Sequence, residues 1–249
     1  MNLVEADFQV PQCLDLSEHE VHVWHADLDA LSSRAEPRLL LLSQDEHRRA
    51  DRFKFDRDRK RYIAGRQFLR TLLSAYLQID LKAVSFDYSP NGKPSLGSEH
   101  NAGGIRCNVS HSDKMAAFAF VRGREVGVDI EQIHQDISVK EIAGRFFSQA
   151  EQAAFADVLE ELKQEAFFLC WTRKEAFVKA KGNGLSLPLD QFDVSLLPRQ
   201  PAQLLGTRPD PKERHRWSMY GLEVSPNYAA ALVVEGQGIR VVEKRTSPM

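Results

Sequence analysis

The chain has 249 residues, of which 43% are hydrophobic and 27% are charged, so it can bury a sizeable core in one large domain or two small ones. Its formal net charge of −2 excludes a general attraction to nucleic acid or to an anionic membrane surface. The three cysteines lie far apart, the chain holds no apolar run of about 18 residues, and the N-terminus lacks the features of a signal peptide, so we expect a cytoplasmic protein.

A pattern of predicted elements occurs twice along the chain, at an offset of about 105 residues. Three pairs of segments correspond in order: 21–25 with 126–130, 41–46 with 146–151, and 86–89 with 192–195. The first pair alternates like a strand. In the second pair, Ser43 and Ser148 are each followed three residues later by a glutamate, which is the pattern of a capping box, so both segments should open a helix.

The repeat predicts an α+β protein built from two similar α/β halves, residues 1–122 and 123–249. Each half should run from a strand through a capped helix and a long helix to closing strands. We expect the halves to pack as a pseudo-dimer within one monomer. Because ligand clefts often lie between domains, the seam between the halves is the expected place for a functional site.

Hydrophobic spacing predicts the longer elements of both halves. The long helices should cover Arg57–Leu77 and Gln164–Lys181, and the closing strands should cover 116–121 and 229–234. The closing segments are short apolar runs, which a buried helix would also match. Four prolines between Leu197 and Arg216 predict an exposed loop there.

Two acidic residues stand out on the first predicted strand of the second half. Asp129 and Glu131 are two residues apart, so both carboxylates leave the same face of that strand. Two such acids repel unless a cation lies between them, and Mg²⁺ is bound by one or two carboxylates together with substrate phosphates. For an isolated pair, a polar face turned to solvent is the alternative. Trp24 is the equivalent of Asp129 in the first half, so a symmetric scaffold would hold an asymmetric site.

The second long helix contributes another charged pair. Glu175 and Lys179 are four residues apart, hence neighbours on one face of that helix. Considered alone, they would form an ordinary surface ion pair that contributes about 0.3–0.5 kcal/mol. A catalytic role for them needs support from the surrounding sequence.

That support comes from two motifs of the second half. They are Val126-Gly127-Val128-Asp129 and, about 40 residues later, Trp171-Thr172-x-Lys174-Glu175-Ala176-x-x-Lys179. Together they resemble the two-part signature of the Sfp-type 4′-phosphopantetheinyl transferases. Further family-like segments occur in order at Asn91-Gly92-Lys93-Pro94, Asn108-Val109-Ser110-His111-Ser112, Arg145-Phe146-Phe147-Ser148 and Gly182-x-Gly184-Leu185. The resemblance spans about residues 43–195, and the two-lobed fold of the family agrees with the repeat.

The resemblance implies transfer of the 4′-phosphopantetheine moiety of coenzyme A to a serine of an apo acyl or peptidyl carrier protein, leaving adenosine 3′,5′-bisphosphate. Such carriers serve fatty-acid, polyketide or nonribosomal peptide synthesis. By the same resemblance, Asp129, Glu131 and Glu175 hold Mg²⁺ with the coenzyme A pyrophosphate. Glu175 would accept the serine proton and Lys179 would face the diphosphate, which makes these two the expected catalytic residues. Glu151 matches a family acid, but we interpret it first as a helix cap.

The resemblance also places coenzyme A against the first half. Arg49 and Arg61 align with family positions that hold the 3′-phosphate, although Glu46 falls where some relatives carry a basic residue. Ser110 and His111 are expected at the adenosine-phosphate end, in a turn just before the next strand. The full set expected to bind coenzyme A is Arg49, Arg61, Asn91, Gly92, Lys93, Asn108, Ser110, His111, Asp129 and Lys179.

Two other functions are weighed against this one. An Mg²⁺-dependent nuclease would need an acid and a lysine two residues apart on a strand, whereas Glu175 and Lys179 are four apart on a predicted helix. An RNA-binding module would use the basic run Arg48–Arg66. Aspartates interrupt that run and no aromatic platform flanks it, so both alternatives are weaker than the transferase.

Overall fold

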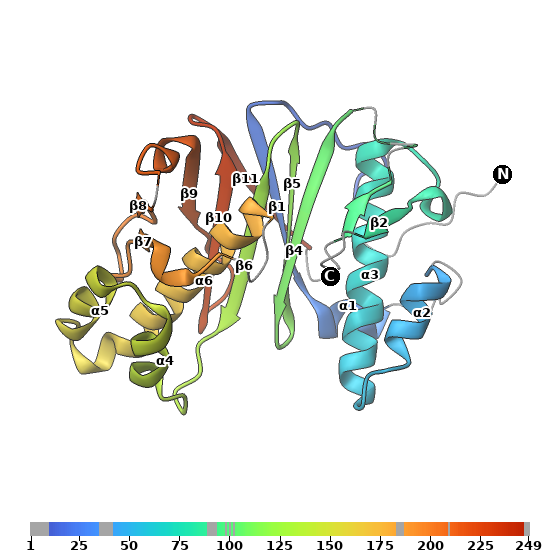
Figure 1. Cartoon of the computed structure of the whole chain (residues 1–249). Helices are drawn as coiled ribbons and strands as arrows, with labels where there is room; N and C mark the ends of the chain where they lie inside the picture. Colours follow the sequence, from blue (N-terminus) through green and yellow to red (C-terminus); the bar gives the residue numbers. More distant parts are fainter. Residues whose placement is uncertain are drawn as a thin grey trace.

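Two β-sheets form the centre of the molecule, and helices cover their outer sides (Figure 1). The computed structural model describes residues 10–34, 42–88, 94–97, 99, 101, 103–182, 187–208 and 210–246. The first half contains β1 (Glu20–Asp27), α1 (Leu28–Arg34), α2 (Gln44–Ala50), α3 (Asp56–Leu77), η2 (Leu81–Ala83), β2 (Phe86–Tyr88), β3 (Pro94–Leu96), β4 (Ile105–Ser112) and β5 (Met115–Arg122). The second half contains β6 (Val126–Gln132), α4 (Val139–Phe146), α5 (Gln149–Ala156), η4 (Glu160–Leu162), α6 (Lys163–Lys181), η6 (Leu189–Gln191), β7 (Phe192–Val194), β8 (Leu204–Thr207), η7 (Glu213–Arg216), β9 (Trp217–Gly221), β10 (Tyr228–Glu235) and β11 (Arg240–Arg245).

The larger sheet has the strand order β11-β1-β5-β4, and the smaller one has the order β6-β10-β9. β1 runs parallel to β11, whereas the other described pairs in these sheets are antiparallel. In the register of the central pairs, Trp24 lies opposite Phe118 and Asp129 lies opposite Ala231. β4 and β6 are therefore edge strands, one at the end of each sheet.

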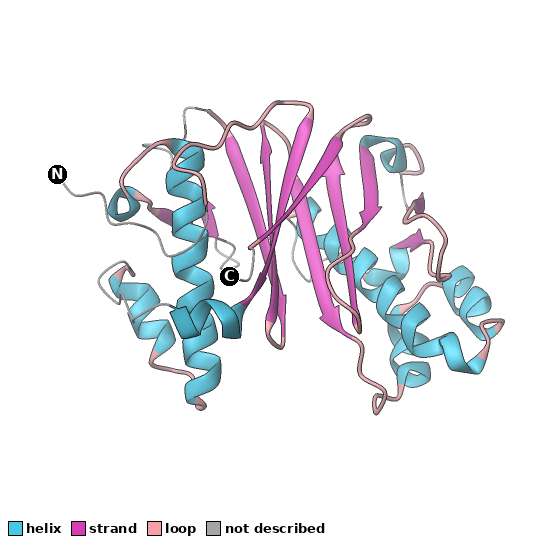
Figure 2. Ribbon diagram, turned by 180° about the vertical axis from the view of Figure 1, so that it is seen from behind, coloured by secondary structure: helices cyan, strands magenta, loops and turns pink. Residues whose placement is uncertain are grey.

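Alternating side chains divide the strands between two faces. In β5, Phe118 and Phe120 pack toward helix α3, whereas Ala119 packs into the core between the sheets. In β6, Val128 and Ile130 contribute to the same core between the sheets. The two sheets thus pack face to face through small and β-branched side chains. Helices α3 and α6 lie on their outer faces, which gives four layers (Figure 2).

The element order repeats as the sequence predicts, with β1, α2, α3, β2 and β5 corresponding to β6, α5, α6, β7 and β10. Helices α3 and α6 each begin one residue before the predicted start and end at the predicted residue. Both closing segments are strands. Ser43 and Ser148 each form a complete capping box with the glutamate three residues on. No helix in the described part of the chain is long and apolar enough to cross a lipid bilayer.

Two sequence predictions about loops were wrong. The segment that contains Ser110 and His111 lies in strand β4, paired with β5, and not in a turn. The turn comes later, at Asp113, whose φ of 48° is a left-handed conformation that aspartate tolerates. The segment from Leu197 to Arg216 holds strand β8 and helix η7. Its prolines lie outside β8, so the backbone amides of β8 are free to pair with β7.

The last strand ties the two halves together. β11 comes from the second half of the sequence but lies in the sheet of the first half, where Glu20 pairs with Arg240. The His25 ring nitrogen Nε2 lies 2.7 Å from a carboxylate oxygen of Glu243. The proposed division at residue 122 therefore separates the two sequence repeats. It does not separate the two sheets, because β11 belongs to the second repeat and to the first sheet.

Candidate active site

The edge strands β4 and β6 meet at the seam between the halves. The main-chain nitrogen of Val128 donates to Asn108 Oδ1 at 2.9 Å, and that of Gln132 donates to Ser112 Oγ at 3.0 Å. Side chains of β4 therefore satisfy edge amides of β6 that would otherwise lack partners. Asn108 was expected to bind coenzyme A, and the structure shows that it joins the two halves.

Asp129 is the most buried carboxylate of this seam, with 3% of its surface exposed. Its Oδ1 accepts hydrogen bonds from Lys179 Nζ at 2.6 Å and from Ser110 Oγ at 2.9 Å. Its Oδ2 is buried and has no hydrogen-bond partner among the residues that the structure describes. Burial raises the pKa of Asp129 even though the Lys179 ammonium acts in the opposite direction. The unbonded Oδ2 of Asp129 could therefore bind a second cation in addition to Lys179.

Gly127 explains why helix α6 reaches Asp129. A Cβ built at position 127 would lie 2.1 Å from the main-chain oxygen of Ala176 and 2.3 Å from the main-chain nitrogen of Ala180. Only glycine allows α6 to pack this closely on β6. The close packing brings Lys179, one residue before Ala180, next to Asp129.

Two further carboxylates lie around Asp129. Ser112 Oγ donates to Glu131 Oε2 at 2.7 Å. Burial raises the pKa of Glu131, and the negative charge of Asp129 raises it further. Burial also raises the pKa of Glu175, with additional contributions from the charges of Asp129 and Glu131. The negative charges of the three acids that the sequence predicted as a group therefore act on one another.

Some features of these three acids favour the binding of a metal ion and others oppose it. Among the described residues, no set of three or more His, Cys, Asp or Glu side chains is arranged to hold a metal ion. The Lys179 ammonium and the Ser110 hydroxyl both donate to Asp129 Oδ1. The unbonded Asp129 Oδ2 and the mutual repulsion of the acids nevertheless suit a cation. Mg²⁺ is commonly bound by one or two carboxylates completed by water and substrate phosphates, so a full protein cage is not required.

His111 lies in the same region, exposed on strand β4. Its pKa is lowered by loss of hydration and then by the positive charges of Lys179, Arg49 and Arg61. Two of the expected nucleotide-binding residues of the first half, Arg49 and Arg61, thus act on His111 with positive charge, together with Lys179 of the second half.

The two arginines differ in how they are held. Arg61 donates to both carboxylate oxygens of Asp29 at 2.6 Å and to Asp113 at 2.7 Å, so its guanidinium is already bonded to two acids. Arg49 lies over the ring of Tyr62, at 5.8 Å from the centroid. A role in binding a phosphate stays a prediction for both. Asn91, Gly92 and Lys93, which were expected to approach the nucleotide, lie outside the described residues.

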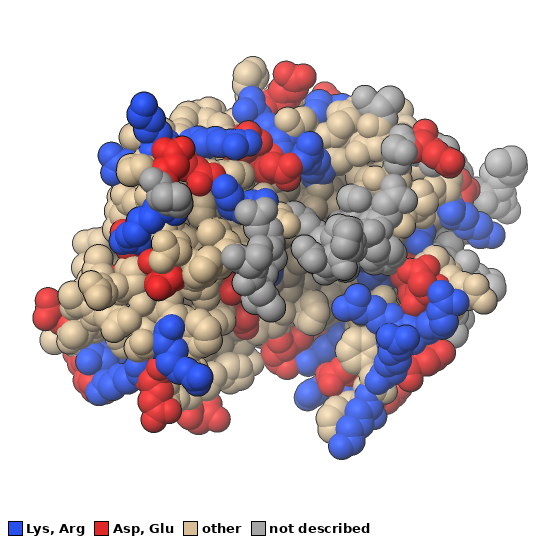
Figure 3. Space-filling view, viewed as in Figure 1, with Lys and Arg blue, Asp and Glu red and all other residues tan. Residues whose placement is uncertain are grey.

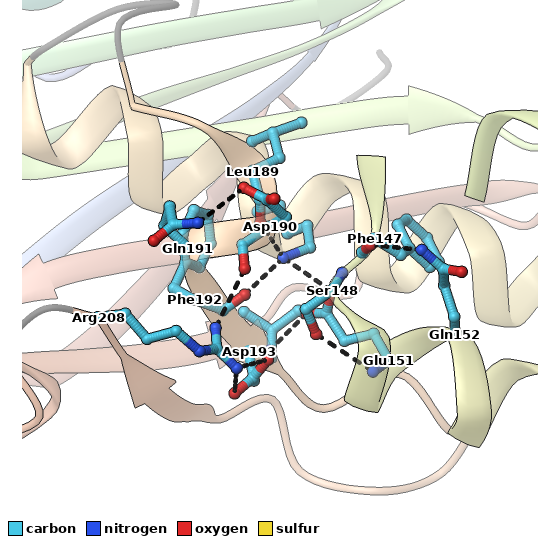
Figure 4. A network of polar contacts seen from close by, with 12 residues as sticks. Phe147, Ser148, Glu151, Gln152, Leu189, Asp190, Gln191, Phe192, Asp193 and Arg208 are labelled. Carbon is cyan, nitrogen blue, oxygen red and sulfur yellow. Dashed lines mark hydrogen bonds and ion pairs between the residues drawn. The ribbon is translucent and has the colours of Figure 1, made fainter. Parts of the chain in front are cut away.

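Sequence reasoning missed the role of Lys174, which precedes Glu175 on α6. Its side chain is fully buried, and its ammonium lies 2.8 Å from Glu151. It also donates to the main-chain oxygens of Leu189 at 2.6 Å and Phe192 at 2.7 Å. Figure 4 shows Glu151 close to Ser148, with Leu189 and Phe192 on the neighbouring segment. Glu151 is therefore both the expected helix cap and half of a buried ion pair.

The first half repeats this arrangement, which was the signal that could have revealed it. Arg70 lies on α3, 104 residues before Lys174, and its guanidinium is 2.8 Å from Glu46. It also donates to the main-chain oxygens of Leu81 and Val84. In both halves, a cation on the long helix thus bonds to the glutamate of the capped helix. The same cation also bonds to main-chain oxygens beside the short strand that follows.

The comparisons with known proteins agree across both halves. Residues 125–233 match a family model described as the 4′-phosphopantetheinyl transferase superfamily, and residues 29–122 match one described as 4′-phosphopantetheinyl transferase, N-terminal. Over 228 residues the chain is 37% identical to 4′-phosphopantetheinyl transferase HetI of Nostoc sp. strain PCC 7120, which covers 92% of this chain and 93% of HetI. Over 194 residues it is 34% identical to 4′-phosphopantetheinyl transferase Sfp of Bacillus subtilis strain 168, which covers 77% of this chain and 81% of Sfp.

A solved structure of Thermotoga maritima holo-[acyl-carrier-protein] synthase matches 45% of this chain and 62% of its own chain. The sequence identity is 22% and the TM-score is 0.36.

Proposed function

Because the chain belongs to the 4′-phosphopantetheinyl transferase superfamily, we propose that it transfers the 4′-phosphopantetheine moiety of coenzyme A to a serine of an apo carrier protein. The observation that supports this most directly is the seam where Asp129, Glu131 and Glu175 converge beside Lys179. Acids and a lysine so placed suit the binding of a metal-bound diphosphate.

Asp129, Glu131 and Glu175 would hold Mg²⁺ together with the coenzyme A pyrophosphate. When bound, the metal supplies positive charge that offsets the charge developing on the phosphate oxygens. The unbonded Asp129 Oδ2 and the raised pKa values of all three acids support this assignment. Lys179 would contribute a second positive charge to the same diphosphate.

Glu175 is our candidate for the group that accepts the serine proton. Burial and the neighbouring acids raise the pKa of Glu175, which makes its carboxylate a stronger base. The serine oxygen would bond to the phosphorus next to pantetheine as the bridging phosphorus–oxygen bond breaks. The serine proton would pass to Glu175, directly or through water, and adenosine 3′,5′-bisphosphate would leave.

The first half would hold the nucleotide end of coenzyme A. The Ser110 hydroxyl faces the seam from β4, and Arg49 and Arg61 are close enough to act on the neighbouring, exposed His111. This cationic surface suits the adenosine phosphates. We further propose that the protein acts as a cytoplasmic monomer.

Neither alternative function gains support. Glu175 and Lys179 lie on helix α6, whereas the nuclease arrangement needs a strand. Lys and Arg side chains gather at the lower right of Figure 3, where α2 ends and α3 begins. Several of the arginines in this run are paired with acids, among them Arg59 with Asp51 and Arg66 with Glu46, which favours a structural role for them.

The decisive experiment is incubation of the purified protein with coenzyme A, Mg²⁺ and a panel of apo carrier proteins, with intact mass as the readout. We expect at least one carrier to gain a phosphopantetheine group. A carrier whose acceptor serine is replaced by alanine is the matched control and should gain nothing. Absence of any mass gain across a broad panel, with a folded protein, would overturn the proposal.

A further inference from the structure

Lys179 has an unusual position for a lysine near a diphosphate site, because its ammonium already binds the central acid. Nζ lies 2.6 Å from Asp129 Oδ1 and 2.9 Å from Ser110 Oγ. The Asp129 side chain is 4% exposed, while that of Lys179 is 28% exposed. The ammonium therefore reaches a buried carboxylate at the end of a side chain that is partly open to solvent.

Lys179 is also the cation that the three site acids share. Its charge lowers the pKa of Asp129, of Glu131 and of Glu175, in each case against a larger effect of burial. It thus compensates part of the repulsion among the acids. A divalent cation among the same acids would do the same, and two cations held this close repel each other.

We propose that Lys179 competes with magnesium for Asp129, and that the coenzyme A diphosphate relieves this competition by giving the ammonium another anionic partner. The inference rests on the proposed function and concerns how its two ligands bind. It makes metal and coenzyme A binding cooperative, because each ligand is bound best when Lys179 has left Asp129. By linkage, each ligand must then strengthen the binding of the other by the same factor.

The experiment is calorimetric titration of the purified protein, with no carrier present. MgCl₂ is titrated into wild type, Lys179→Met and Lys179→Arg, each alone and with saturating coenzyme A. Methionine keeps the apolar stem without the charge, and arginine keeps the charge. For the protein alone, Lys179→Met should bind Mg²⁺ at least about tenfold more tightly than wild type, because a nearby repelling cation is gone. Lys179→Arg should stay within a few-fold of wild type.

Coenzyme A should strengthen Mg²⁺ binding to wild type by about fivefold or more, which is an ordinary coupling between sites. The gain should be clearly smaller in Lys179→Met. This wild-type coupling is measurable even if Lys179→Met fails to fold, and equal Mg²⁺ affinity with and without coenzyme A would overturn the proposal. Equal or weaker Mg²⁺ binding to a folded Lys179→Met would overturn it as well.

These outcomes are distinct from failure of the proposed function. A protein that modifies a carrier but shows no Mg²⁺ competition loses only the inference about Lys179. A protein that binds no Mg²⁺ in any form, even with coenzyme A, loses both the metal site and the inference.

Discussion

Replacing Lys174 by methionine tests whether the buried pair with Glu151 fixes helix α6. The Lys174 side chain is 0% exposed, its ammonium is 2.8 Å from Glu151, and it also donates to the main-chain oxygens of Leu189 and Phe192. Methionine keeps most of the side-chain volume but leaves Glu151 buried without its cation. Because removing one partner of a buried pair costs about 3–5 kcal/mol of unfolding free energy, we expect a melting temperature about 6–20 °C lower.

This destabilisation should depend on pH because Glu151 titrates. Burial raises the pKa of Glu151, while the charge and the hydrogen bond of Lys174 act in the opposite direction. For a raised carboxyl pKa, the stabilising contribution is complete below the unfolded-state pKa and is lost as the pH rises through the folded-state pKa. Without Lys174 the folded-state pKa rises further. The difference from wild type should therefore be smallest in mild acid and largest above neutral pH.

Urea denaturation of both proteins from about pH 4.5 to about pH 8 measures this difference. Lys140→Met is the matched control, because it removes a cation from an exposed pair with Glu160 and should leave stability unchanged. The double variant Glu151→Gln/Lys174→Met should recover part of the loss, since no buried charge is left unpaired. A folded Lys174→Met as stable as wild type at alkaline pH, or a loss that does not vary with pH, would refute the reasoning.

Three further outcomes are expected. Asp129→Ala should abolish carrier modification while weakening coenzyme A binding much less, because the first half is proposed to hold the nucleotide; calorimetry and a modification assay separate the two effects. Lys179→Ala should lower turnover by roughly 100-fold or more with the fold retained, the scale for deleting one preorganised charge. Gly127→Ala should destabilise the protein by about 1–3 kcal/mol or more in urea denaturation, since the new Cβ would lie 2.1 Å from the Ala176 oxygen and 2.3 Å from the Ala180 nitrogen.

Each of these has a contrary result that is easy to recognise. Near-normal turnover in Asp129→Ala would mean that the metal site is elsewhere. Turnover within a few-fold of wild type in Lys179→Ala would mean that the Lys179 charge does not act on the transition state. Gly144→Ala is the control for Gly127→Ala, because its added Cβ would meet no described atom within 4 Å beyond its chain neighbours and its own helix backbone, and a helix favours alanine. Equal stability of the two glycine variants would contradict the packing argument.

The sequence by itself determined the local elements and the asymmetry of the site. The spacing of apolar residues located α3 and α6, and Ser43 and Ser148 marked the starts of the two capped helices. The two-residue spacing of Asp129 and Glu131 placed both on one face of β6. These features depend only on residues within about four positions of one another. They can therefore be predicted from a short stretch of sequence, without knowing how that stretch packs in the fold.

Only the tertiary structure decided which distant groups meet. Lys179 is one helical turn from Glu175, yet its ammonium bonds to Asp129, 50 residues away, because α6 packs closely on β6 at Gly127. Lys174 lies next to Glu175 in sequence, but it is buried against another helix. The strand predicted as a turn at 108–111 and the crossing of β11 to β1 likewise depend on pairing with remote segments. The physical reason is that the strength of an ion pair or a strand pairing depends on burial, and burial is set by how whole sheets and helices pack.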